Sequence, residues 1–383
     1  MTKRLAEYNN AYNFRLTIVI GLWFAVNFCF ASNGPDKIAK IDRTLWPYPI
    51  NSAHNFDVAS KCEMLVFTKA FKAYEGLSEE ELQQKLDLKK VSVTSVREWE
   101  AKTKQILVAN FKSLSKASLQ DLIAINEIYK WEDVAKIHPE SKLPSALKAW
   151  YHASLDFYDK YLYEQCRLAS LYPRITSEIG LLSKNEINGF NLSVKQFVWT
   201  FDDGPTVKNG NTDKMVKVLN EQHQKGIFFV LGDALQKRMQ SDKQIQNLYQ
   251  GHLLASHGKT HVSHQKLDDW KTSLIYTSDL IQQLTDSDKP VYFRPPYGQR
   301  TEELAKSLGA SQSKVILWNI DSQDWNAHIT AREVADRQIS LMLLWRRGIL
   351  LFHDVHEKAQ LAVPYILNYF KGTDIHWVQP NEI

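Results

Sequence analysis

The sequence lacks the features that mark nucleic-acid-binding and nucleotide-binding proteins. Its 383 residues carry a formal net charge of only +4, whereas a nucleic-acid-binding domain usually carries a strong basic patch. It contains no glycine-rich loop of the kind that cradles a phosphate. We therefore expect no nucleic acid among its partners. The length exceeds that of the usual single domain, so two domains are expected, and nothing in the sequence indicates an oligomeric state.

A full membrane-spanning run is missing as well. The apolar run at residues 16–31 follows three basic residues but falls short of the roughly 20 residues that a spanning helix needs. It predicts that residues 1–31 are an export signal, cleaved after Ala31. An uncleaved anchor in the inner membrane is the alternative. Both place the rest of the chain in the periplasm or outside the cell.

Cysteine is scarce, with three residues in the chain. Cys29 would leave with a cleaved signal, so Cys62 and Cys166 would remain. An exported protein reaches an oxidising compartment, where such a pair can form a disulfide. The spacing does not decide whether the two residues meet, so a disulfide and two free thiols both stay open.

The first half of the chain has the pattern of amphipathic helices. Residues 96–111 and 143–171 carry apolar side chains at intervals of three and four. Ser78, with Glu81 three positions later, forms a capping box that starts another helix. We predict an all-α domain of unknown role over residues 32–190. It contains no catalytic constellation, and an adaptor role in the cell envelope is one alternative for it.

Two adjacent acids end a strand-like run in the second half. Residues 197–205, with the sequence FVWTFDDGP, are mostly apolar as far as Asp202 and Asp203, and a Gly-Pro turn follows. Strand side chains alternate between faces, so both carboxylates serve one site only if the strand ends there. One acid can then bind a metal while the other moves a proton. A solvated hairpin turn is the alternative, because Asp-Gly is a common turn signal.

A pair of histidines follows further along the chain. His257 and His261 stand four positions apart within the sequence SHGKTH. Glycine and threonine between them weaken a helix, so a loop is expected. Glycine also stands where a helical zinc protease needs its glutamate base. Two neutral imidazoles together with Asp203 make a facial set that leaves positions for water and substrate on a metal. Solvated surface histidines are the alternative.

Three more apolar segments end in polar residues. They are residues 291–298 (VYFRPPYG), 315–325 (VILWNIDSQDW) and 348–354 (GILLFHD). Catalytic groups at the carboxyl ends of successive strands are typical of parallel β/α barrels. Each segment alone could be a solvated strand end. Their repetition predicts an α/β fold in this half, with an active site at the strand ends.

These motifs, in this order, resemble the five motifs of the polysaccharide deacetylases, also called carbohydrate esterase family 4 or the NodB-homology family. The motifs are TFDDGP, HGKTH, RPPYG, DSQDW and LLFH, and the resemblance covers roughly residues 195–370. It implies a distorted (β/α) barrel for residues 191–383, preceded by the all-α domain. One departure is visible. The family usually has Ser or Thr after the first metal histidine, and Gly258 stands there, which affects the rigidity of the loop more than the identity of the ligands.

The resemblance implies a metal-dependent hydrolysis of acetyl groups on sugars. Asp203, His257 and His261 would hold a divalent metal, most often zinc, although such ligands also accept cobalt, nickel or manganese. Asp202 would act as the general base on water activated by the metal. Arg294 would pair with Asp202 and keep it ionised.

The remaining roles come from the same resemblance. His353 would protonate the departing amine, and Asp324 would orient His353 and favour its imidazolium form. The backbone N–H of Tyr297 would stabilise the oxyanion together with the metal. Trp325 and Leu351 would form a small apolar wall for the methyl group of the acetyl.

The expected function is removal of acetyl groups from N-acetylated sugars of an envelope or extracellular polysaccharide. Peptidoglycan, chitin-type chains and poly-N-acetylglucosamine are all chemically adequate, because the motifs recognise only the acetyl group and its nearest sugar. An O-acetyl esterase acting on acetylated polysaccharide is one alternative, and a non-catalytic glycan-binding or adaptor protein is another. Against the binding protein, every chemically required residue type is present, including Asp202 and His353.

Overall fold

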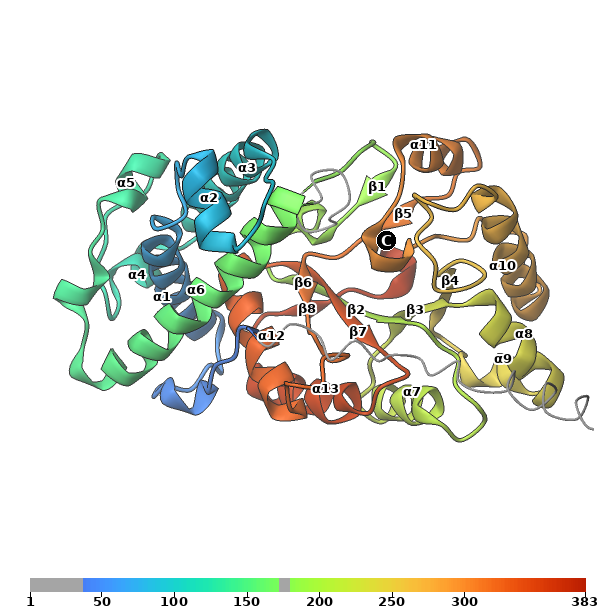
Figure 1. Ribbon diagram of the computed structural model, residues 1–383. Coiled ribbons are helices and arrows are strands. Elements are labelled where there is room, and N and C mark those ends of the chain that lie inside the picture. The colour runs from blue at the N-terminus through green and yellow to red at the C-terminus, as the bar shows by residue number, and fades with distance from the viewer. Residues whose placement is uncertain (1–36, 172–179) are drawn as a thin grey trace, which may run out of the picture. The chain divides into compact units, whose positions relative to one another are not determined.

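The computed structural model describes residues 37–171 and 180–383 (Figure 1). The predicted export signal, residues 1–31, lies outside the described residues, so its cleavage and any membrane association stay predictions. Within the described ranges, no helix combines the length and the apolar character that crossing a membrane requires. By its internal contacts, Gly34–Ile383 forms one compact unit.

The first half is helical, as the spacing of its apolar residues predicts. Its helices are α1 (Ala53–Phe71), α2 (Glu79–Leu86), α3 (Val93–Lys112), α4 (Lys116–Gln120), α5 (Trp131–Ala135) and α6 (Lys148–Leu171). The capping box at the start of α2 forms as predicted. Ser78 Oγ accepts a hydrogen bond from the Glu81 N–H at 3.2 Å, and the Glu81 carboxylate accepts one from the Ser78 N–H at 2.7 Å. The two long helices α1 and α6 pack against each other.

The second half contains a parallel sheet. Its strands are β2 (Gln196–Asp202), β3 (Gly226–Val230), β4 (Leu253–Ser256), β6 (Ile320–Asp321), β7 (Gly348–His353) and β8 (His376–Trp377). The order is β4-β3-β2-β7-β6 with β8 beside β2, and every pair is parallel. The predicted α/β fold is therefore confirmed. Parallel pairing brings the carboxyl ends of β2, β4 and β7 to one edge of the sheet.

A short pair of strands extends this sheet. β1 (Glu186–Ile187) pairs with β5 (Val315–Ile316), and Phe293 forms single bridges to Ser256 of β4 and Val315 of β5. No ladder joins β5 to β6 in the part of the chain that the structure describes, so complete closure into a barrel stays a prediction. β1 precedes the domain boundary predicted at residue 190 and nevertheless takes part in strand pairing.

Helices follow most of these strands and pack around them (Figure 1). They are α7 (Asn211–Glu221), α8 (Gly232–Ser241), α9 (Ile245–Leu248), α10 (Trp270–Thr285), α11 (Glu302–Ala310), α12 (Ala331–Trp345) and α13 (Lys358–Tyr369). Alternate side chains of β2 enter two different cores. Trp199 and Phe201 join the large core, whereas Val198 joins a smaller cluster. Since side chains alternate along a strand, Thr200 and Asp202 share the side of Val198.

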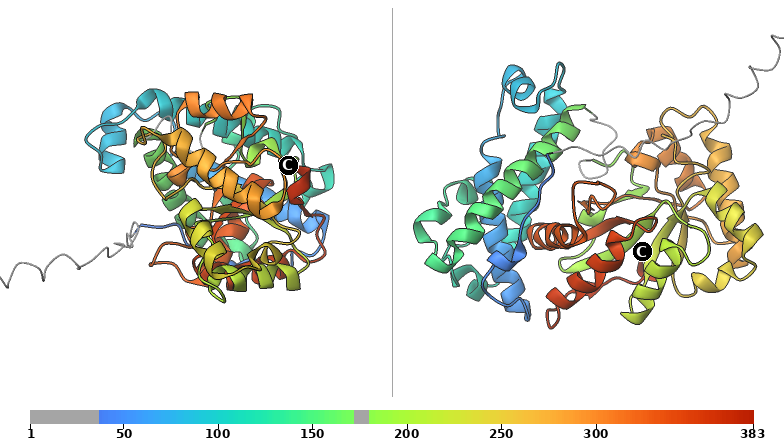
Figure 2. Two further views of the ribbon diagram at one scale, coloured as in Figure 1. Left: turned by 90° about the vertical axis from the view of Figure 1, so that its right-hand side faces the viewer. Right: turned by 60° about the horizontal axis from the view of Figure 1, so that its bottom comes forward.

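Helix α12 is buried along its length, from Val334 to Trp345. A helix on the surface of a domain normally keeps a polar stripe toward the solvent. α12 packs against α13, β6 and β7 on one hand and against α1 and α3 of the helical region on the other (Figures 1 and 2). The helical region therefore covers a side of α12 that would otherwise be exposed.

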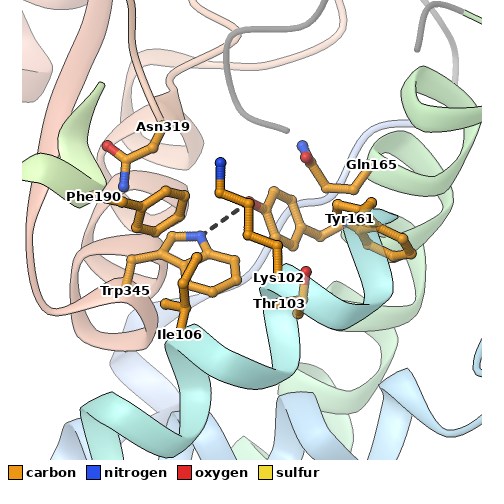
Figure 3. A pocket seen from close by; sticks show the side chains of 9 residues that line it. Lys102, Thr103, Ile106, Tyr161, Gln165, Phe190, Asn319 and Trp345 are labelled. Carbon is orange, nitrogen blue, oxygen red and sulfur yellow. Dashed lines mark hydrogen bonds between the residues drawn. The ribbon is translucent and has the colours of Figure 1, made fainter. Parts of the chain in front are cut away.

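The contact between the helical region and the end of α12 is close (Figure 3). Trp345 Nε1 donates a hydrogen bond to the Tyr161 hydroxyl at 3.0 Å. Asn110 Nδ2 donates to the carbonyl oxygens of Leu344 at 3.4 Å and of Trp345 at 3.2 Å. The cavity beside these side chains has a volume of about 10 Å³, which is room for about one water molecule. The two halves thus share a packed boundary.

Both described cysteines are free thiols, and both are buried. Cys62 lies on α1 and Cys166 on α6. Burial raises the pKa of each thiol to about 12, so neither is a reactive thiolate at neutral pH. Of the two alternatives that the sequence left open, the structure has the free thiols.

Candidate metal and catalytic site

The two acids at the end of β2 reach one site because the strand ends between them. Asp202 is the last residue of β2, and Asp203 has a φ of 78°, a left-handed conformation that is uncommon for residues other than glycine. This turn takes Asp203 out of the alternation of the strand. Gly204 then donates its N–H to Asp354 Oδ1 at 3.1 Å. A Cβ atom at Gly204 would lie 2.2 Å from Asp354 Oδ2, so the turn requires glycine.

The two histidines lie on the loop after β4, as the sequence predicts. Gly258 between them has a φ of +84°, and a Cβ atom there would lie 2.4 Å from the ring of His264. His264 is buried, and its Nε2 lies 2.9 Å from Ser273 Oγ. At the position where the family usually has Ser or Thr, the loop is therefore supported by the packed ring of His264.

The ligand atoms of Asp203, His257 and His261 lie within 4.8 Å of one another. Asp203 Oδ1 is 3.4 Å from His257 Nε2 and 3.5 Å from His261 Nε2. His257 Nδ1 lies 2.8 Å from the carbonyl oxygen of Arg294. Because a carbonyl only accepts, Nδ1 carries the proton and Nε2 presents a lone pair. Asp203 Oδ1 is buried without a hydrogen-bond donor, so this set of converging lone pairs fits a divalent metal.

The protonation states of the three residues suit a metal site. Burial lowers the pKa of His257 to about 3 and also lowers the pKa of His261. Burial opposes the ionisation of Asp203, but nearby imidazoles, that of His353 foremost, hold the pKa of its carboxyl below the ordinary value. At neutral pH the histidines are neutral and the aspartate is ionised, which are the forms that bind metals.

Asp202 is held by a buried arginine. Arg294 Nη1 donates hydrogen bonds of 2.8 Å to Asp202 Oδ1 and to Thr200 Oγ1. The guanidinium carbon lies 4.0 Å from the centre of the Phe229 ring. Burial raises the pKa of Asp202 to about 6, against the opposing effect of the Arg294 charge. The other carboxylate oxygen, Oδ2, lies 3.8 Å from His257 Nε2 and so faces the metal ligands.

His353 lies beside Asp202, because the two are register partners on the parallel strands β7 and β2. Its Nδ1 is 2.7 Å from Asp324 Oδ1, and its backbone N–H donates to Asp324 Oδ2 at 2.9 Å. Burial disfavours the charged ring, but the Asp324 carboxylate outweighs it and raises the pKa of His353 to about 10. The Asp324 carboxylate therefore favours the imidazolium form of the ring.

Tyr297 lies at the rim of the metal ligands. It is the central residue of the turn Pro296–Gly298, with a φ of 60°, and its ring centre lies 4.4 Å from that of His261. Leu351 is buried in the smaller core cluster, and Trp325 is half-buried. The role of the Tyr297 N–H at an oxyanion and the apolar wall of Trp325 and Leu351 stay predictions.

The sequence pattern of the polysaccharide deacetylases matches residues 191–313. These residues belong to the polysaccharide deacetylase family. The peptidoglycan-N-acetylglucosamine deacetylase PgdA of Listeria monocytogenes is 29% identical over 196 residues, which are 49% of this chain and 39% of that protein. Chitin deacetylase 2 of Saccharomyces cerevisiae is 28% identical over 184 residues, 46% of this chain and 55% of that protein. The solved structure of the peptidoglycan deacetylase PdaC from Bacillus subtilis matches at 25% identity with a TM-score of 0.39, covering 46% of this chain and 83% of that one.

The deacetylase match contains the first three motifs and ends before the last two. The fold brings the last two to the same place. β7 carries His353 next to β2, and the loop after β6 carries Asp324 to His353. The geometry therefore brings residues of all five motifs to one site.

Two buried residues at this site were given no role from the sequence. Asp354 is 1% exposed and holds the Gly204 turn, and burial raises its pKa to about 7. His264 packs against Gly258. The sequence did show both residues as polar groups near the motifs: Asp354 directly follows His353, and His264 is a third histidine after His257 and His261. Neither signal says which groups the side chain contacts.

Replacing a metal ligand is expected to remove the bound metal. His257→Ala leaves two protein ligands, and a catalytic site with three has none to spare. Elemental analysis of the purified variant should show metal far below one ion per chain, and Asp203→Ala and His261→Ala should behave alike. His356→Ala is the matched control, because its ring lies near His353, 6.1 Å between centres, outside the ligand set. Near-stoichiometric metal in any ligand variant would remove that residue from the set.

Proposed function

We propose that this protein is a metal-dependent hydrolase that removes acetyl groups from N-acetylated sugars of an envelope or extracellular polysaccharide. The observation that carries the proposal is the register pairing of Asp202 with His353 beside the three metal-ligand residues. A carboxylate base, an imidazolium acid and a cation site are the groups that amide hydrolysis needs. The family to which residues 191–313 belong supports the same chemistry.

Asp203, His257 and His261 are the residues that would hold the metal. When bound, a divalent metal would polarise the acetyl carbonyl and lower the pKa of water toward ~7, as in the best zinc sites. Zinc suits two imidazoles and one carboxylate best, and cobalt, nickel and manganese suit the same ligands.

Asp202 acts as the general base in this proposal. Arg294 holds Oδ1, so Oδ2 is the oxygen that takes a proton from the attacking water. A base is most effective when its pKa lies near the working pH, and burial raises the pKa of Asp202 to about 6. The Arg294 hydrogen bond also fixes the direction in which the carboxylate faces.

His353 acts as the general acid and gives its proton to the nitrogen of the departing sugar amine. The Asp324 carboxylate keeps the ring charged and fixes its orientation. The backbone N–H of Tyr297 would donate to the developing oxyanion, and Trp325 with Leu351 would enclose the acetyl methyl group. A deprotonated His353 cannot serve as this acid, so activity should fall as the pH rises through its pKa.

The substrate is proposed to be a glycan that carries N-acetylglucosamine. PgdA of Listeria monocytogenes is named for peptidoglycan and the yeast relative for chitin, and both polymers contain that sugar. The run at residues 16–31 supports export, which would bring the protein to such a polymer. An O-acetyl esterase remains the second candidate, because the same groups would hydrolyse an ester.

An acetate-release panel tests the proposal. The protein is incubated with peptidoglycan, chitin oligomers and acetylxylan, each with and without a chelator. Release from peptidoglycan or chitin oligomers that stops with chelator and returns with zinc is the expected result. Release from acetylxylan alone would favour the esterase. Binding to a polymer without any acetate release would favour the non-catalytic alternative.

His353→Ala is expected to harm amide substrates more than activated esters. An amine must be protonated to leave, whereas a phenolate need not be. The measurement is a ratio of rates, on an acetylated glucosamine oligomer and on an aryl acetate. Metal content should stay near normal, because Asp203, His257 and His261 complete the ligand set. Equal loss on both substrates would assign His353 a structural role, and loss of metal would mean that it is a ligand.

Asp324→Asn is the matched variant for that experiment, because it keeps the imidazole and removes the charge that raises its pKa. The folded-state pKa of His353 lies above its ordinary value, so the acid form is present at neutral pH and is lost as the pH rises. Without the Asp324 charge this loss occurs at lower pH. The alkaline fall of the amide rate should therefore move to lower pH in Asp324→Asn.

A further inference from the structure

A buried arginine joins the helical region to α12. Arg337 Nη2 donates to Glu164 Oε2 at 2.7 Å and Nη1 donates to Glu164 Oε1 at 3.2 Å. Glu164 lies on α6, and Arg337 is 1% exposed on α12. The pair is closed by Ala39, whose N–H donates to Glu164 Oε1 at 2.7 Å and whose carbonyl accepts from Arg337 Nη1 at 3.1 Å. A bidentate pair of this kind fixes the plane of the guanidinium.

The same guanidinium reaches the turn that leads to Asp324. Arg337 Nε donates to the carbonyl oxygen of Asp321, the last residue of β6, at 2.9 Å. The Asp321 carboxylate accepts from the Gln323 N–H at 2.8 Å and from Gln323 Nε2 at 3.1 Å. Gln323 has a φ of 58°, a conformation that persists when the surroundings hold it. The turn is therefore held at its first residue by an arginine whose own position depends on α6.

The catalytic imidazole lies at the end of this series of contacts. Asp324 binds both Nδ1 and the backbone N–H of His353. A shift of the turn moves Asp324 relative to His353 and changes the direction in which the ring presents its other nitrogen. A misplacement of a catalytic group by 1 Å can cost roughly 10²-fold in rate.

We propose that Glu164 and Arg337 are positioning residues of the deacetylase site, through which the helical region holds the Asp324 turn and with it the orientation of His353. The inference rests on the proposed function, since it concerns the same acid. In this inference the helical region helps to orient the catalytic acid, and it also covers one side of α12.

The test is Glu164→Gln in the full chain, which keeps the size of the side chain and removes its charge. On an acetylated glucosamine oligomer we expect kcat to fall about tenfold, with KM changed by less than about twofold and bound metal unchanged. The fall should be smaller on an aryl acetate, because that leaving group does not need His353. Loss of stability alone would affect both substrates alike.

Asp57→Asn is the matched control. Arg346 Nη2 donates to Asp57 Oδ1 at 2.8 Å, so this is also a buried ion pair between the helical region and the end of α12. Arg346 follows Arg337 by nine positions, about 13 Å along a helix axis. Among the described residues, neither Asp57 nor Arg346 forms a hydrogen bond or an ion pair with the Asp324 turn. We expect Asp57→Asn to lower thermal stability and to leave kcat within about twofold of wild type.

A folded Glu164→Gln protein with kcat within about twofold of wild type would overturn the proposal, and so would an equal loss in Asp57→Asn. Should the wild-type chain release no acetate at all, the proposed function fails, and nitrogen-15 labelling of histidine still tests the positioning. The Nδ1 proton of His353, bound to Asp324, should shift or broaden in Glu164→Gln and stay unchanged in Asp57→Asn. An unchanged signal in Glu164→Gln would contradict the inference.

Discussion

Asp202→Asn should keep the fold and the metal and lose most of the deacetylase activity. Asparagine has the same shape and still accepts a hydrogen bond from Arg294, but its amide cannot take a proton from water. A positioned acid–base group contributes roughly 10²–10⁴-fold, so acetate release should fall by that amount. Metal content and thermal unfolding of the purified variant show whether the loss lies in the chemistry. A loss below roughly tenfold would argue against Asp202 as the base.

Thr200→Val is the control for that substitution. Thr200 lies two residues before Asp202 on the same side of β2, and its hydroxyl accepts the other hydrogen bond of Arg294 Nη1. Valine has nearly the same size and leaves the base in place. The same hydroxyl donates to the Leu350 carbonyl oxygen of β7 at 2.6 Å. If Thr200→Val were as inactive as Asp202→Asn, loss of these supporting contacts would explain both variants, and the assignment of the base would fail.

Separated from the helical region, the α/β half should fail to fold cooperatively. A fragment of residues 184–383 exposes the side of α12 that α1 and α3 cover in the full chain. Leu341 and Leu344 are fully buried, and the Trp345 ring lies 5.5 Å from that of Phe67 on α1. Each such side chain contributes about 1.5–3 kcal/mol by burial, against a total stability of about 5–15 kcal/mol. We expect aggregation or a loosely packed state.

The fragment is compared with a chain of residues 34–383. The measurements are near-ultraviolet circular dichroism, binding of a hydrophobic dye and thermal unfolding. Co-expression of residues 34–183 with the fragment is the control, because it restores the missing cover and should restore solubility. A sharp thermal transition and full acetate release from the fragment alone would show instead that the halves are independent. That result would favour the adaptor alternative for the helical region.

The elements of the fold followed from local patterns, but the surroundings of α12 did not. The spacing of apolar residues predicted the long helices, and apolar runs ending in polar residues predicted β2 and β7. In α12, Asp336, Gln338 and Ser340 are buried, although residues of these types usually indicate a solvent-facing stripe. Their cover comes from helices far away in the sequence, and local periodicity carries no information about such contacts.

For the candidate site as well, some features could be predicted from the sequence and others could not. Residue types and motif order predicted the clustering of Asp203, His257 and His261, since the carboxyl ends of parallel strands meet at one edge. The sequence predicted that the strand ends at the two acids. It did not predict the left-handed conformation of Asp203, because an aspartate does not require a positive φ. The link from Glu164 to the Asp324 turn could not be predicted, since no spacing connects a residue of α6 with a turn after β6.

The pairing of β2 with β7 has a consequence for anyone who wishes to redesign the enzyme. The two strands are in register from Phe197 with Gly348 to Asp202 with His353, and neighbouring strands lie about 4.8 Å apart. The register of the two strands therefore sets the spacing of the backbone positions that carry the proposed base and the proposed acid, and substitutions elsewhere on the strands leave that spacing unchanged. A new polymer has to be accommodated by the loops beyond the strands, where Val207, Val262 and Tyr297 are exposed. Libraries that vary exposed side chains of these loops, such as Val207 and Val262, and leave both strands, the metal-ligand residues and Tyr297 untouched should change which glycan is cleaved while hydrolysis itself is retained.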